Sequence, residues 1–246
     1  MKRHKLLMGL AVVGAALLAL TGCHKPEKAA KPAKSYPAQN VIVQSSKISI
    51  NSARMQQMTI HGTTKANLDA KYFVKGDNRI AKVTFAQNKS TIHYWYKDNR
   101  MYARAKGMPK WVTTKVSDEN QQALNQAASV TSLRTIWARL GHDKPALIDY
   151  RKDGSTTTLT LANNAKNRKA IMRLLNNGSD NKRNLSYVYM QMQVDNNLNA
   201  PVRLVMNIKG MVNGKAVEED QTVTGINKYG YLKVPKKIIK TAIKQK

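Results

Sequence analysis

The 246-residue chain is poor in several residue types, and each shortage narrows what it can be. Cysteine occurs once, so an internal disulfide cannot form and the fold must be held together by its core. Acidic residues number 14 against 42 lysines and arginines, which gives a formal net charge of +28. The longest uninterrupted apolar run, from Leu6 to Leu20, is shorter than the about 20 residues that span a bilayer.

The chain also lacks the residue patterns of catalytic and metal sites. No Gly-x-Ser-x-Gly motif and no phosphate-cradling glycine loop occurs. The adjacent His142 and Asp143 would rarely face one substrate, and Glu218-Glu219-Asp220 is interpreted as solvated charge on a strand. None of the histidines has the spacing of a metal site; they are His4, His24, His61, His93 and His142. We therefore predict a protein that is not an enzyme and needs no metal or cofactor.

The first 22 residues have the features of an export signal. A basic stretch, Met-Lys-Arg-His-Lys, precedes the apolar run, and Leu20-Thr21-Gly22-Cys23 follows it. This tetrapeptide resembles the lipobox of bacterial lipoproteins, which implies cleavage between Gly22 and Cys23 and a diacylglycerol on the Cys23 sulfur. Two or three acyl chains, at about 0.8 kcal/mol per buried methylene, make a stable tether. The alternatives are an ordinary signal peptide with an incidental cysteine and an uncleaved membrane anchor.

Residues 23–39 are predicted to form the lipidated cysteine and a flexible stalk. From residue 24 to residue 39 the chain is mainly Pro, Ala and Lys, a composition typical of disordered, self-repelling linkers. At roughly 3.1 Å per residue, an extended stalk would hold the rest of the chain away from the bilayer. Residues 40–246 then fit a single domain at the outer face of the cytoplasmic membrane, exposed to the cell wall.

The excess of basic residues remains after the signal is removed. Loss of Lys2, Arg3 and Lys5 lowers the formal charge from +28 to +25. The basic residues are spread along the chain, so their field attracts polyanions with little selectivity. Outside a cell membrane these are anionic lipid headgroups and phosphate-rich wall polymers, and the export signal argues against nucleic acid as a partner. A general basicity of the organism's secreted proteins is the alternative explanation.

Short alternating apolar segments predict that most of the body is β-structure. Turns rich in Asp, Asn and Gly separate the segments, and Asn213-Gly214 is a strong hairpin signal. Pro109 cannot donate to a ladder, so the segment around it is expected at a sheet edge. Strands are expected over residues 41–50, 55–60, 68–74, 80–85, 91–96, 101–105, 108–112, 146–150, 156–161, 185–194, 202–208 and 217–224.

Three segments change to a helical period. Ser117 followed by two acids marks the start of a helix of about six turns, which Gly141 is expected to end. A second helix is expected over residues 165–175, and a short helix after Pro235. The order of elements predicts the α+β class, with an antiparallel sheet of about ten strands and helices on one face.

The lipobox, the opening meander, the interposed helices and the late hairpins also resemble a known group of proteins. The ending Thr222-Val-Thr-Gly-Ile-Asn-Lys-Tyr-Gly-Tyr-Leu-Lys-Val-Pro-Lys-Lys-Ile adds to the likeness. Together they resemble firmicute surface lipoproteins of a domain-of-unknown-function family related to LolA- and LppX-like lipoprotein and lipid carriers, over roughly residues 40–244. The resemblance implies a curved sheet that forms a half-open β-barrel, with helices on its concave face and a lipid or acylated protein in its mouth.

Side chains on neighbouring strands are the candidate ligand contacts. Val188, Met190 and Met192 alternate along one face of a predicted strand, and Met206 lies on the next strand. Methionine adapts to irregular surfaces, so these residues, with Trp137 of the first helix, could line a lipid-sized cavity. Ordinary sheet core packed under a helix is the alternative interpretation.

Two functions follow from these features, and a structural or sensor role is a third option. The first is non-enzymatic binding of a lipid or other apolar ligand by a membrane-anchored extracytoplasmic lipoprotein. The second is a basic interaction protein that docks on anionic wall polymer, the membrane surface or a protein partner. The second predicts binding that weakens with salt, because exposed charges are screened within about 10 Å at 0.1 M.

Overall fold

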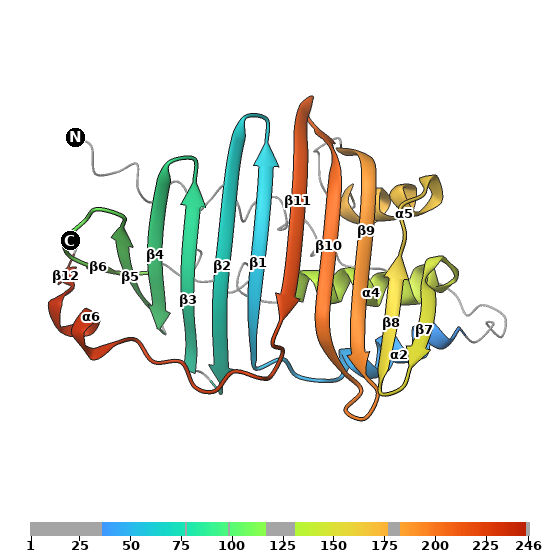
Figure 1. Ribbon diagram of the computed structural model, residues 1–246, viewed down its shortest axis with the longest axis horizontal. Helices are drawn as coiled ribbons and strands as arrows, with labels where there is room; N and C mark the ends of the chain where they lie inside the picture. The colour runs from blue at the N-terminus through green and yellow to red at the C-terminus, as the bar shows by residue number, and fades with distance from the viewer. Residues whose placement is uncertain (1–35, 77, 98, 117–130, 177–182, 245–246) are drawn as a thin grey trace.

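The computed structural model describes residues 36–76, 78–97, 99–116, 131–176 and 183–244. These form an α+β structure dominated by one open sheet of twelve strands, in the order β12-β6-β5-β4-β3-β2-β1-β11-β10-β9-β8-β7 (Figure 1). All neighbouring strands pair antiparallel except β12 and β6, which are parallel. The signal segment, Gly22, Cys23 and most of the predicted stalk lie outside the described residues.

The first half of the sheet is a meander of six strands joined by tight turns. The hairpin between β3 and β4 turns at Asn88, which has the positive φ of 52° that asparagine tolerates better than most residues. Each strand therefore pairs with its successor along the chain, the arrangement that short connections favour. The strands are β1 (Ser52–His61), β2 (Thr64–Lys75), β3 (Asn78–Gln87), β4 (Ser90–Lys97), β5 (Arg100–Ala105) and β6 (Val112–Lys115).

The second half is built from five strands and joins the first half through β1 and β11. Asn213 and Gly214, with φ of 49° and 77°, form the two-residue turn between β10 and β11, as predicted. Strand β11 then returns beside β1, with Met55 opposite Val223 and Gln57 opposite Gln221. The strands are β7 (Asp149–Asp153), β8 (Thr156–Leu161), β9 (Arg183–Asp195), β10 (Ala200–Val212) and β11 (Lys215–Thr224).

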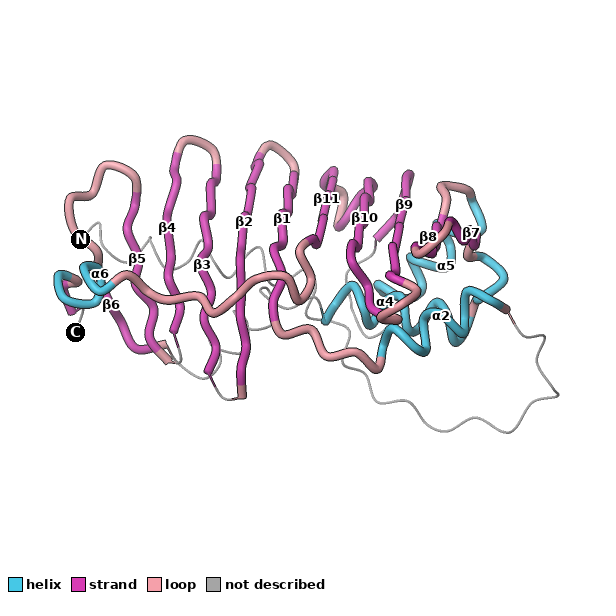
Figure 2. The backbone as a smooth tube through the Cα atoms, turned by 60° about the horizontal axis from the view of Figure 1, so that its bottom comes forward, coloured by secondary structure: helices cyan, strands magenta, loops and turns pink. Residues whose placement is uncertain are grey.

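Three helices pack on one face of this second half: α2 (Pro37–Ser46), α4 (Thr131–Asp143) and α5 (Ala165–Asn176). Helix α5 contacts β9, whereas α2 contacts α4, β7 and β10. Figure 1 shows these helices behind the half of the sheet that holds β7 to β11, and Figure 2 shows them together at that end. The short 3-10 helix η3 (Pro145–Leu147) links α4 to β7.

The C-terminal segment crosses the opposite face of the first half. It leaves β11, runs along the bottom of the sheet in Figure 1 and ends in α6 (Lys236–Thr241) and β12 (Ile243–Lys244). Val234 and Ile238 of this segment bury themselves against Ile80, Trp95 and Tyr102. This second, smaller core holds the end of the chain against the sheet.

The α+β class and most of the strands and helices agree with the sequence prediction, but the sheet has twelve strands instead of about ten. The helices also do not all lie on one face, because Ile238 of α6 packs on the face opposite α2, α4 and α5. The expected strand over 41–50 is wrong, because the chain forms α2 from Pro37 to Ser46. Pro37 suits the first helical turn, and Ala38, Ile42 and Ser45 bury one helical face. Helix α2 thus begins inside the segment predicted as stalk.

Further boundaries differ from the prediction. The strand expected over 108–112 begins only at Val112, after the loop that contains Pro109. Helix α4 continues through Gly141, where a Cβ atom would lie 2.9 Å from the Ile42 side chain, so this glycine lets α2 approach α4 closely. The strand expected over 146–150 begins only at Asp149, after the 3-10 turn. The first turns of the predicted 117–140 helix, up to residue 130, lie outside the described residues.

Gly210 should be essential to the β9–β10 pairing. The ladder is irregular between Lys209 and Gly210, and a Cβ atom on Gly210 would lie 2.1 Å from the carbonyl oxygen of Asn184. We expect Gly210→Ala to lower the free energy of unfolding by about 1–3 kcal/mol, because the backbone must shift to remove the clash. Urea unfolding followed by circular dichroism measures this change.

Gly230→Ala is the matched control. No heavy atom lies within 4 Å of a Cβ atom built on Gly230, so the added methyl group meets nothing. We expect its unfolding free energy to stay within about 0.5 kcal/mol of the parent value. Equal stability of the Gly210→Ala and Gly230→Ala proteins would contradict the close backbone approach.

Candidate ligand-binding face

Strand register divides the side chains of the sheet between two faces. We call the face that carries α2, α4 and α5 the inner face, and the face crossed by the C-terminal segment the outer face. Directly opposed residues share a face, so Met190, Met206 and Gln221 all lie on the inner face. The register carries this face on through Gln57, Leu68, Phe85 and Ile92 of the first half.

The five predicted cavity residues all lie in the helix-covered half of the inner face. Met190 is opposite Met206, and Met192 lies near α2, where the Ser45 hydroxyl is 3.8 Å from its sulfur. Every one of the five is at most 2% exposed: Trp137, Val188, Met190, Met192 and Met206. The structure thus brings them together as packed core, and their role as ligand contacts stays a prediction.

A buried polar strip marks the boundary between the two halves of the inner face. Gln57 of β1 donates a hydrogen bond of 2.7 Å to the carboxylate of Glu219 on β11, and both side chains are buried. Beside them the Gln221 amide lies 2.9 Å from the Met55 sulfur, while Gln221 Oε1 has no partner among the described residues. Burying such groups is costly, so the strip interrupts the apolar face locally, whereas Met55 and Val223 of the same two strands continue the core across it.

The remaining half of the inner face, on β2 to β5, is apolar and rich in aromatic side chains. Tyr72, Phe85, Tyr94 and Tyr96 lie among small and aliphatic neighbours, and all are buried. Burial raises the pKa of Tyr94 to about 12, so this phenol stays protonated at any physiological pH. We call this set the β2–β5 face: Leu68, Ala70, Tyr72, Val83, Phe85, Tyr94, Tyr96, Met101 and Ala103.

The described helices lie away from the β2–β5 face. Their main contacts with the sheet are to β7, β9 and β10, and Figure 2 shows α2, α4 and α5 together at that end. Arg134 of α4 is fixed near the boundary by hydrogen bonds to the carbonyl oxygens of Ser46 (2.6 Å) and Ser45 (3.5 Å) at the end of α2. Burial lowers its pKa, although the nearby Tyr72 opposes this shift.

The outer face has a different chemistry. Cations there lie over aromatic rings: Lys82 is 5.7 Å from the Trp95 ring centre, and Arg104 is 5.1 Å from that of Trp111. The ion pair between Arg54 and Asp69, at 2.7 Å, lowers the pKa of the carboxyl group and raises that of the guanidinium. Apart from the small core beneath the C-terminal segment, this face carries cations interleaved with aromatic rings.

The prediction that Glu218, Glu219 and Asp220 of β11 are solvated is wrong for one of the three residues, Glu219. Glu218 pairs with Lys209 at 2.8 Å on the outer face, and Asp220 accepts a hydrogen bond from Asn207 there. Glu219, between them, points to the inner face and is only 4% exposed. The side chain of Glu219 is therefore a structural group of the polar strip, which the sequence alone did not reveal.

Two other groups of chemical interest lie at the surface. His142 and Asp143 contact each other at 2.7 Å, with the imidazole 86% exposed. Across the part of the chain that the structure describes, no three His, Cys, Asp or Glu side chains are grouped to hold a metal ion. Within the same residues, no helix is both long and apolar enough to cross a membrane.

The β2–β5 face was missed by sequence reasoning, which placed its ligand candidates on β9 and β10. A signal was present, because Tyr94, Tyr96 and Ile92 alternate along one strand. The predicted lipidation site, Cys23 with Gly22, lies outside the described residues. No protein-family model matches the chain, and the curated proteins searched contain no significant match. The likeness to LolA- and LppX-like carriers therefore stays a prediction.

The hydrogen bond between Gln57 of β1 and Glu219 of β11 should make the effects of mutating these two residues on stability interdependent. We expect Gln57→Leu to lower the unfolding free energy by about 2–3 kcal/mol, because a buried carboxylate loses a donor. The double variant Gln57→Leu/Glu219→Leu should cost at least about 1 kcal/mol less than the sum of the two single changes. Urea unfolding of the four proteins completes this double-mutant cycle.

Gln56→Leu provides the control on the same strand. Gln56 is exposed on the outer face, so we expect its replacement to change the unfolding free energy by less than about 0.5 kcal/mol. Strictly additive effects of the Gln57 and Glu219 changes would show that the two residues do not act together.

Proposed function

We propose that the protein is a membrane-anchored extracytoplasmic lipoprotein that binds a lipid or other apolar ligand without catalysis. In this proposal the sheet curves into a half-open barrel, with α2, α4 and α5 filling one end of its concave face. The ligand lies against the β2–β5 face. The chain itself is the binding element and needs no cofactor.

The observation that carries the proposal is the uneven helix cover of a continuously apolar inner face. Helices of the described chain pack on β7 to β10, whereas the equally apolar β2–β5 face lies beyond them. The side chains of this face are at most 8% exposed, and apolar regions of this kind are kept from water by protein, by a partner or by a ligand. An acyl chain matches this face in polarity.

The side chains of the β2–β5 face also suit an apolar ligand of variable shape. Ala70 and Ala103 are buried beside the bulky rings of Tyr72, Tyr94 and Phe85, so the face mixes small and large side chains. Aromatic walls with a few polar tips are typical of small-molecule sites. The polar strip gives such a site one hydrophilic border, where a ligand headgroup would find buried amide and carboxyl groups.

A fluorescent fatty acid, cis-parinaric acid, tests the proposed site. The chain from His24 onward keeps every described element and should bind the probe with a rise in its emission. Ala103 of β5 is buried opposite Tyr94 on this face, so we expect Ala103→Phe to weaken probe binding at least about tenfold, because the larger ring competes with the probe for this position. Circular dichroism verifies that the variant is folded.

Ala86→Phe is the matched control, because Ala86 lies on the outer face of β3, opposite Thr91. It should bind the probe like the parent protein. If the parent protein does not bind the probe, or if both phenylalanine variants weaken binding equally, the proposed ligand face is wrong. Met190→Leu, which preserves volume in the helix-covered half, should leave the affinity unchanged.

The lipid anchor makes a separate prediction. The parent chain, expressed in a bacterium that lipidates its lipoproteins, should incorporate labelled palmitate and partition into the detergent phase. Replacing the only cysteine, Cys23→Ser, should abolish both, since no other thiol is present. Palmitate incorporation that persists in the Cys23→Ser protein would exclude the proposed lipidation site.

A further inference from the structure

Exposed apolar side chains gather at the edge of the sheet formed by β6, β12 and α6. Ile239 and Ile243 are 46% and 50% exposed, and Met108, in the loop that leads into β6, is 47% exposed. Ile243 belongs to the outermost strand of the sheet, where it pairs with Val112 of β6. Three of the large exposed apolar residues thus lie along this edge.

The same edge is strongly cationic. From residue 225 to the end, the sequence has seven lysines and no acidic residue. Four of these lysines lie on or beside α6 and are exposed: Lys236, Lys237, Lys240 and Lys244. They alternate with the exposed isoleucines along the chain, so cationic and apolar groups are mixed within a few residues.

This arrangement is held in place by the rest of the fold. Ile238 and Val234 are buried against Ile80, Trp95 and Tyr102 of the outer face. The backbone amide of Ile243 donates a hydrogen bond of 2.9 Å to the carbonyl oxygen of Trp111. The lysines and isoleucines are therefore presented on a docked segment, which limits the conformational entropy lost on binding.

The need to prevent this edge strand from pairing with other chains explains the lysines but not the exposed isoleucines. Lysines on an edge strand hinder pairing with other chains, but exposed isoleucines on the same edge favour association. An anionic polymer would account for the lysines and leave the isoleucines in water. A lipid surface accepts both kinds of group, because phosphates attract lysines and the headgroup boundary accepts apolar side chains.

We propose that the β6–β12–α6 edge binds the surface of an anionic lipid bilayer, with Ile239 and Ile243 in the headgroup boundary and the four lysines against lipid phosphates. This contact does not depend on the apolar ligand or on the anchor at Cys23. In the anchored protein it would orient the sheet with this edge on the membrane, because a tether raises the local concentration of the second contact.

Vesicle sedimentation tests the proposal with the chain from His24 onward, which lacks the predicted anchor. Vesicles of phosphatidylglycerol and phosphatidylcholine should bind the protein, and pure phosphatidylcholine vesicles should not. We expect the variant K236Q/K237Q/K240Q/K244Q to bind at least about 50-fold more weakly, from the attraction that each lysine near an anionic surface provides. The variant I239S/I243S should bind more weakly at unchanged charge.

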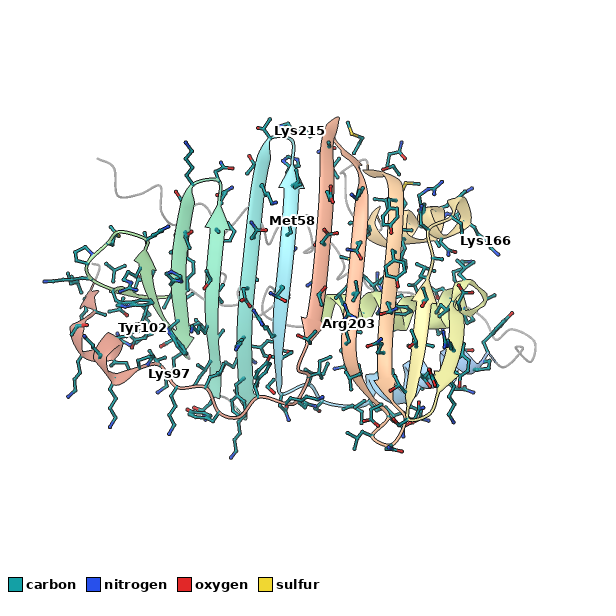
Figure 3. The ribbon with its side chains drawn as sticks, viewed as in Figure 1. Met58, Lys97, Tyr102, Lys166, Arg203 and Lys215 are labelled. Carbon is teal, nitrogen blue, oxygen red and sulfur yellow. The ribbon has the colours of Figure 1, made fainter. Side chains whose placement is uncertain are left out.

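The control removes the same number of charges at the opposite end of the sheet. Lys152 lies on β7, the other edge strand, and Lys166, Lys169 and Arg173 are exposed on α5. Figure 3 labels Lys166 on α5, at the end of the sheet away from α6. The variant K152Q/K166Q/K169Q/R173Q should lose less than about fivefold in vesicle affinity, since these groups lie far from the proposed contact.

Three results would overturn the proposal. Equal losses from the two four-charge variants would show a general attraction of the +25 chain for anions. Full vesicle binding by I239S/I243S, together with tight binding to a soluble polyphosphate chain, would assign the edge to an anionic polymer. Failure of the parent chain to bind anionic vesicles would exclude a lipid contact, whatever the outcome of the fatty-acid experiment.

Discussion

Strands β1 and β11 pair from Arg54 opposite Thr224 to His61 opposite Val217, although the hydrogen-bonded Gln57 and Glu219 are 162 residues apart in the chain. This ladder is the only strand pairing that joins the first meander to the second within the described sheet. Its formation must offset the loop-closure entropy of nearly the whole body. The continuity of both faces of the sheet depends on it.

The β1–β11 pairing also places the polar strip between two apolar regions with different surroundings. On one side, Met190 and Met206 pack beneath helices and act as core. On the other side, the aromatic β2–β5 face lies beyond the described helices, and the proposed ligand binds there. The C-terminal segment, docked on the outer face, adds a cationic edge at the end farthest from the helices.

Local patterns predicted the elements well where burial alternates simply. Val188, Met190, Met192 and Val194 alternate as expected in β9, and the Asn213-Gly214 turn lies where it was predicted. Helix α2 was mistaken for a strand because its β-branched residues outweighed the helical spacing of Ala38, Ile42 and Ser45. The burial of Glu219 and the role of Gly141 arise from long-range pairing and helix packing, which no local window contains.

The central claim is that an apolar ligand occupies the inner face of the sheet, and native mass spectrometry tests it most directly. The chain from His24 onward would be expressed in a bacterium whose envelope is of the same kind as that of the natural host. Its mass would be measured with and without prior lipid extraction. The account predicts a bound apolar mass that extraction removes. A ligand-free mass, together with no extractable lipid beyond the anchor in full-length protein purified from its membrane, would contradict it.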